Sequence, residues 1–178
     1  MDIIDSIKNE VITILDNDPA HDFDHVMRVY NNAQKIIKKE KVNPKLVLSA
    51  VLLHDIVSYP KSSKRSKFSS IDSAKKSKII LKKYGFSKEE IIIISNAIAE
   101  HSFAQNKVPQ TIEGKILQDA DRLDALGAIG IARVFATSGS LNRPFYNIDD
   151  PFCIKRNSDD DLWAVDHFFN KLLKLESM

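Results

Sequence analysis

An apolar run that ends in a histidine and an aspartate constrains this chain more than any other feature. The run spans residues 46–53, LVLSAVLL, and Pro44 stands where a helix would begin. At about 100° per residue its apolar side chains point in every direction, which predicts a helix buried on all sides. His54 and Asp55 follow directly. A buried imidazole and carboxylate are unfavourable unless paired or bound to a metal ion, so we look for partners elsewhere in the chain.

Helical patterns dominate the rest of the sequence. Residues 91–94 are four isoleucines, whose β-branching favours a strand, but the capping box from Ser87 to Glu90 decides for a helix. Gly85 is predicted to end the preceding helix, since glycine is common at helix C-termini. No pair of strands is apparent, so the sequence predicts an all-α fold. We expect helices over about 2–16, 22–41, from 44 to the His54-Asp55 pair, 70–84, 111–126, 128–137 and 160–175.

Residues 138–160 are expected to form a long loop that contains Pro144 and Pro151. A loop of this length is unusual in a compact domain. We therefore expect it to be functional or to wrap the surface.

Composition is typical of a globular protein of one domain. The 178 residues are 43% hydrophobic and 28% charged, and this length allows a sizeable core. No apolar run approaches a membrane span, and the N-terminal residues lack the pattern of a signal peptide. The single cysteine, Cys153, excludes an internal disulfide and makes the cytoplasm the expected location.

Positive charge is concentrated in residues 61–83, which carry nine Lys or Arg residues against one acid, Asp72. For Lys75 to Lys83 a solvated helix face is the simpler interpretation. The part from Lys61 to Lys67 follows closely on the His54-Asp55 pair and better suits an anionic ligand. Nucleic-acid binding is disfavoured, because no aromatic stacking platform interleaves with these lysines as in single-strand binders.

Two other helices bring polar groups to apolar faces. His25 lies at the edge of the apolar stripe of residues 22–41, and Asp121 lies at the border of the buried face of 111–126. Each of these residues alone could be structural. Together with His54 and Asp55 they make two imidazoles and two carboxylates, a set that suits a divalent metal ion.

The motifs along most of the chain resemble those of the HD-domain superfamily of metal-dependent phosphohydrolases. The order H…HD…D is one of them; the others are HDFDH at 21–25, AEHSF at 99–103, EGK at 113–115, QDADRLDA at 118–125, GAIGIAR at 127–133 and DHFF at 166–169. This resemblance, to a subgroup of small bacterial and archaeal HD hydrolases, covers roughly residues 20–175. It implies one all-helical domain over 1–178, with an HD core of about 20–126 and a C-terminal extension of helices and a long loop over about 127–178.

The resemblance also implies one divalent metal ion held by His25, His54, Asp55 and Asp121. On a six-coordinate ion these four ligands would leave two positions for water and a phosphate oxygen. Mn²⁺, Mg²⁺, Co²⁺, Fe²⁺ or Ni²⁺ would fit the mixed nitrogen and oxygen set, whereas Zn²⁺ is less suited to an octahedral site.

The sequence departs from the family pattern in one respect. Many HD nucleotidases carry an acidic catalytic residue shortly after the HD pair, but here no acid occurs until Asp72. Asp124 could orient the water instead, or it could be a buried acid paired with an arginine. His101 is a candidate general acid or phosphate contact, with a core histidine bonded to a carbonyl as the alternative. The candidate phosphate contacts are Arg28, Lys61, Lys64, Arg65 and Arg133.

We therefore expect a metal-dependent phosphohydrolase that acts on a small phosphorylated substrate, with a nucleotide favoured. Cleavage of a nucleoside triphosphate to monophosphate and pyrophosphate would suit the basic segment. The alternative is a non-catalytic HD-fold sensor that binds a nucleotide or metal. The sequence leaves the oligomeric state open, with a homodimer as one option.

Overall fold

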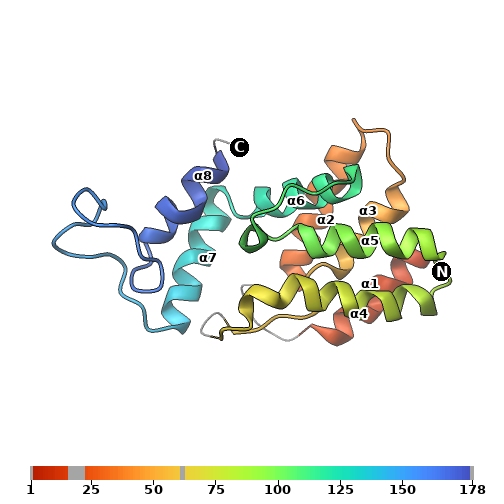
Figure 1. The fold of residues 1–178 in the computed structure, drawn as a ribbon, viewed down its shortest axis with the longest axis horizontal. Coiled ribbons are helices and arrows are strands. Elements are labelled where there is room, and N and C mark those ends of the chain that lie inside the picture. The colour runs from red at the N-terminus through yellow and green to blue at the C-terminus, as the bar shows by residue number, and fades with distance from the viewer. Residues whose placement is uncertain (1, 16–22, 61–62, 177–178) are drawn as a thin grey trace. The chain divides into compact units, whose positions relative to one another are not determined.

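The computed structural model describes residues 2–15, 23–60 and 63–176, and within these ranges it contains helices and no strands. This confirms the all-α prediction. The α-helices are α1 (Ile3–Ile14), α2 (Phe23–Ile37), α3 (Pro44–Leu53), α4 (Ser69–Lys83), α5 (Lys88–Glu100), α6 (Ile112–Asp124), α7 (Gly127–Ser140) and α8 (Leu173–Glu176) (Figure 1). In the described part of the chain, no helix is long and apolar enough to cross a membrane.

The chain divides into two compact units, residues 1–123 and 124–178. The first holds α1 to α5 and nearly all of α6, and the second begins at the last residue of α6. The expectation of a single domain with a C-terminal extension stays a prediction.

Helix α3 forms the centre of the first unit. All eight residues from Leu46 to Leu53 are buried, and α3 contacts α1, α2, α4 and α5. The prediction of a helix buried on all sides is confirmed. The Asn43 side chain accepts a hydrogen bond from the Lys45 amide and Pro44 occupies the first turn, where its missing N–H would have no partner within the helix. The polar pair after α3 is thus held at the end of a rigid element.

The helix predicted from the four-isoleucine run is also confirmed, as α5. Ser87 and Glu90 form the complete capping box, each side chain bonding the other residue's amide. Before it, α4 ends as predicted: Gly85 takes a φ of +73°, and the Phe86 amide bonds back to the Leu81 carbonyl. Such a left-handed residue after a helix is best suited to glycine. Helices α4 and α5 pack closely, and the Ser70 hydroxyl of α4 donates to the Ala99 carbonyl of α5 at 3.4 Å.

The second unit departs from the sequence prediction in its last helix. A helix over 160–175 was expected, but the helical segment starts only at Asp166, with a π-helical stretch Phe168–Leu172 followed by α8. Asp166 explains the difference: its buried carboxylate accepts hydrogen bonds from the Arg156 guanidinium and from the Asp159 amide. These bonds hold residues 156–165 in an irregular conformation.

Candidate metal centre

His54 caps the C-terminal end of α3 and is completely buried. Its Nδ1 lies 2.6 Å from the carbonyl oxygen of Val51. Because a carbonyl only accepts hydrogen bonds, Nδ1 carries the hydrogen and Nε2 has a bare lone pair. Burial lowers the pKa of His54, which favours the neutral form that binds metal ions.

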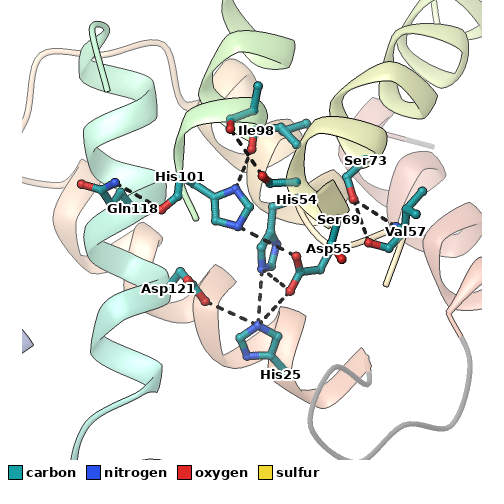
Figure 2. A network of polar contacts seen from close by, with 12 residues as sticks. His25, His54, Asp55, Val57, Ser69, Ser73, Ile98, His101, Gln118 and Asp121 are labelled. Carbon is teal, nitrogen blue, oxygen red and sulfur yellow. Dashed lines mark hydrogen bonds and ion pairs between the residues drawn. The ribbon is translucent and has the colours of Figure 1, made fainter. Parts of the chain in front are cut away.

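Three further groups gather around the Nε2 atoms of His54 and His25 or supply one of them: His25, Asp55 and Asp121 (Figure 2). The Nε2 of His25, from α2, is 3.3 Å away. Asp55 follows His54 in the chain, and its Oδ2 is 3.5 Å from the Nε2 of His54 and 3.7 Å from that of His25. Asp121, from α6, places Oδ1 3.6 Å from the Nε2 of His25. Three helices separated along the chain therefore bring the four expected ligands together.

The electrostatics of Asp121 follow from this cluster. Burial alone would raise the pKa of its carboxyl group, but the imidazoles of His25, His101 and His54 hold the pKa below its ordinary value. Asp121 is therefore ionised at neutral pH, which is the form that binds a cation.

The donor set fits one divalent ion. Neighbouring ligand atoms on one ion lie roughly 3.0–3.4 Å apart when each is about 2.1 Å from the ion, and the four contacts given above span 3.3–3.7 Å. Possible ligand atoms of His25, His54 and Asp121 all lie within 4.8 Å of one another. Two imidazole nitrogens with two carboxylates suit a borderline or hard divalent cation.

His101 also reaches this cluster. It caps α5, and its Nδ1 lies 2.6 Å from the carbonyl of Ile98, which assigns the hydrogen to Nδ1 as in His54. Its Nε2 is 3.9 Å from Oδ1 of Asp55, the oxygen that does not face His25. His54, Asp55 and His101 form a second group of three potential ligands. The bond to a carbonyl matches the core-histidine interpretation, but His101 also faces Asp55, and its catalytic role stays a prediction.

Sequence reasoning gave no role to Gln118, which holds the loop after His101. Gln118 is buried on α6, one turn before Asp121, and its Nε2 donates to the carbonyls of Glu100, His101 and Lys107 at 3.5, 3.2 and 3.0 Å. One amide group thus joins the helix that carries Asp121 to the backbone of His101 (Figure 2). A sequence signal that could have pointed to Gln118 is its place on a buried helix face, three residues before the expected ligand Asp121.

We predict that Gln118→Leu lowers the free energy of unfolding by about 1–3 kcal/mol, because three carbonyls lose their donor while the side-chain volume is kept. The matched control is Gln110→Ala. Gln110 is exposed and its side chain donates to the nearby carbonyl of Val108, so its change should stay within about 0.5 kcal/mol. Urea unfolding monitored by circular dichroism measures both variants. Equal stabilities for the two would contradict this role for Gln118.

The candidate phosphate contacts of the first unit have mixed environments. Arg65 donates to the hydroxyl of Tyr59 at 2.9 Å and to Asp72 at 3.3 Å, and it stacks on the Tyr59 ring at 4.6 Å. Lys64 is exposed beside it. Arg28 is half-buried on α2, one turn after His25, and Lys61 lies outside the described residues. Binding of phosphate by these residues stays a prediction.

Asp72, the first acid after the HD pair, takes part in the same contacts. It accepts hydrogen bonds from Tyr59 at 3.0 Å and Lys75 at 2.9 Å. The bonds from Lys75 and Tyr59 keep the pKa of Asp72 below its ordinary value. Its carboxylate therefore anchors the segment after Asp55 to α4.

Asp124 and Arg133 belong to the second unit. The Asp124 carboxylate is buried and accepts a hydrogen bond of 2.8 Å from the Arg133 guanidinium. This is the arginine pairing that the sequence analysis gave as the alternative to a catalytic role. The water-orienting role of Asp124 and the phosphate contact of Arg133 stay predictions.

Comparison with known proteins agrees with the motif resemblance. A family model for the HD domain matches residues 22–126. YpgQ of Bacillus subtilis strain 168 is 36% identical over 181 residues, which cover 98% of this chain and 79% of YpgQ. The crystal structure of YpgQ in complex with ADP matches with a TM-score of 0.70 at 33% identity, covering 99% of this chain and 80% of that chain.

A crystal structure of an HD-superfamily hydrolase from Bacillus thuringiensis matches equally well. Its TM-score is 0.70 at 34% identity, covering 98% of this chain and 80% of that chain. The helical fold described above is therefore shared with proteins that match nearly the whole length of this chain. The chain belongs to the HD-domain family.

Proposed function

We propose that this protein is a metal-dependent phosphohydrolase that acts on a small phosphorylated substrate, with a nucleotide as the favoured class. The observation that carries the proposal is the convergence of His25, His54, Asp55 and Asp121 from three parts of the chain, with the Nε2 of His54 left bare by its bond to Val51. The two imidazoles are buried and the two carboxylates are half-buried, and a cation among them would compensate the cost of this placement. The fold shared with HD-superfamily hydrolases supports the same activity.

These four residues would hold one ion, with Mn²⁺, Mg²⁺, Co²⁺, Fe²⁺ or Ni²⁺ preferred over Zn²⁺. When bound, the ion would lower the pKa of a water molecule, orient the phosphate and neutralise developing charge. The bond between His54 and Val51 fixes the imidazole orientation, as outer hydrogen bonds do in metal sites generally.

Two residues are candidates for the proton transfers. Because its ring hydrogen lies on Nδ1, His101 would first bind a second proton at Nε2, the nitrogen that faces Asp55 and the cluster, and would then donate that proton to a substrate oxygen. Asp124 would orient the attacking water, and this role would require its contact with Arg133 to loosen. Separate measurement of His101→Gln and Asp124→Asn would test the two assignments.

Nucleotide specificity is proposed from two observations. Lys64, Arg65 and Lys67 follow Asp55 within twelve residues, and basic side chains at this place suit a polyphosphate. In addition, the relative YpgQ was crystallised with ADP. Within this class we propose hydrolysis of a nucleoside triphosphate to monophosphate and pyrophosphate.

A substrate panel tests the proposal. The protein loaded with Mn²⁺, Mg²⁺, Co²⁺ or Ni²⁺ is incubated with nucleoside mono-, di- and triphosphates and with simple phosphate esters, and the released phosphate and pyrophosphate are measured separately. We expect turnover of at least one nucleotide, with pyrophosphate as product from a triphosphate. A loaded preparation that hydrolyses none of these compounds would overturn the proposal.

A second candidate is a nucleotide sensor without catalysis. The observation that favours it is the lack of an acidic residue between Asp55 and Asp72, where many HD nucleotidases carry a catalytic acid. The same panel separates the two candidates when thermal unfolding is measured in parallel. A nucleotide that raises the unfolding temperature without being hydrolysed would favour the sensor.

A further inference from the structure

The segment 144–156 of the second unit turns large apolar side chains toward solvent. Five of them are at least half exposed: Phe145 (61%), Tyr146 (50%), Ile148 (83%), Phe152 (68%) and Ile154 (80%). We call these five residues the outer face. Single exposed apolar residues are normal on protein surfaces, but five within ten residues indicate an interaction site.

Polar groups of the same segment point inward and brace it. The Asn147 side-chain oxygen accepts hydrogen bonds from the amides of Asp149 and Asp150, both at 2.9 Å. The Asp150 carboxylate accepts from the amides of Ile154 and Lys155, at 2.9 and 2.7 Å. A usual surface loop has the reverse arrangement, with polar groups outward. The bracing therefore holds the outer face in a defined shape while leaving it uncovered.

The base of the segment is fixed to its own unit. The amides of Ala164 and Val165 donate to the carbonyls of Pro144 and Phe145 at 3.0 and 2.8 Å. The Phe145 ring also packs edge-on against Phe135, with centroids 5.0 Å apart. Figure 1 shows the chain between α7 and α8 as a blue loop that extends beyond these helices. The outer face is thus presented by an anchored loop.

We infer that the outer face is the contact surface of a homodimer. Its charges favour a second copy of this chain: residues 144–156 carry Asp149 and Asp150 against Lys155 and Arg156, a formal charge of zero. A twofold contact places this surface against the same surface of the second copy. Because the surface has no net charge, the two copies do not repel each other electrostatically. A nucleic acid or an anionic membrane would instead require an excess of Lys and Arg.

The size of the outer face also suits a dimer. Its five side chains expose on the order of 600 Å² per subunit, against about 800 Å² per partner in a standard interface. Aromatic and aliphatic residues are enriched at the centre of homodimer contacts. A twofold contact centred on the outer face would therefore need only a modest rim from the neighbouring residues.

Sedimentation velocity of the full-length chain between about 1 and 100 μM tests the inference. We expect wild-type protein to sediment at twice the monomer mass of 20.1 kDa. Ile154→Asp and Phe152→Asp each place a charge in the contact and should weaken the dimer at least about a hundredfold. Both side chains are already exposed, so the subunit fold should persist, which circular dichroism checks for each variant.

The matched control is Ile79→Asp, on α4 of the first unit, where the side chain is 74% exposed and no contact is proposed. It should dimerise like the wild type. Three results would overturn the inference: a wild-type monomer over the whole range, a dimer that neither outer-face variant weakens, or equal weakening by the control. None of these measurements depends on the proposed activity or on the metal.

Discussion

Asp55→Ala should abolish metal binding and lower phosphohydrolase activity at least about a thousandfold, a loss of about 4 kcal/mol of transition-state stabilisation. The Oδ2 atom of Asp55 faces both imidazoles of the cluster, at 3.5 Å from His54 and 3.7 Å from His25. Removing this carboxylate takes away a proposed ligand and one of the two negative charges that would neutralise the ion. Metal content after dialysis should fall from one ion per chain to near zero, as measured by inductively coupled plasma mass spectrometry.

The control for this experiment is Asp119→Ala. Asp119 is exposed on α6, two residues before Asp121, so the substitution removes a carboxylate of the same helix without touching the cluster. It should keep wild-type metal content and activity. Wild-type activity in Asp55→Ala would contradict the assignment of the site, whereas loss in both variants would indicate a general effect of charge.

Arg156→Ala should destabilise the unit 124–178 by about 3–5 kcal/mol, because it leaves the carboxylate of Asp166 buried without its cation. Asp166 is fully buried and accepts two hydrogen bonds from the guanidinium, one of them at 2.8 Å. The same guanidinium stacks on Trp163 at 4.3 Å and donates to the carbonyl of Asp150 at 3.2 Å. Hydrogen exchange of the α7 amides, measured by mass spectrometry, should accelerate accordingly.

Lys155→Ala is the matched control for Arg156. Lys155 is an exposed cation next in the sequence, and its substitution should change stability by no more than about 0.5 kcal/mol. Replacing both members of the pair, as in Arg156→Met with Asp166→Leu, should restore much of the lost stability, since no charge then remains buried. Unchanged exchange rates in Arg156→Ala would show that the ion pair does not hold this segment.

The sequence was sufficient to predict most helices because their signals are local. The capping box at Ser87 and Glu90 and the glycine at position 85 act within one or two turns. The start of the last helix could not be predicted in this way. Residues 160–165 stay irregular because Asp166 bonds to Arg156, ten residues earlier, and helical periodicity carries no information on such a partner.

In the candidate site, too, local sequence patterns predicted some features, whereas others depend on contacts between distant parts of the chain. Helical periodicity placed His25 and Asp121 at the edges of apolar faces. Polar groups in apolar surroundings are unfavourable without a partner, and this linked the two residues to His54 and Asp55. The contacts of Gln118 depend instead on the path of the loop after α5, because its acceptors are the backbone carbonyls of residues 100, 101 and 107. For the same reason, the bonds that engage Arg65 with Tyr59 and Asp72 were not predicted.

One divalent ion is proposed to join three separate helical segments of the first unit. Anomalous diffraction from crystals grown with Mn²⁺ would locate this ion. We predict a single strong anomalous peak within about 2.0–2.3 Å of the nearest donor atom of His25, His54, Asp55 and Asp121. No peak at this cluster under saturating Mn²⁺, or an ion bound by a different set of residues, would contradict the account.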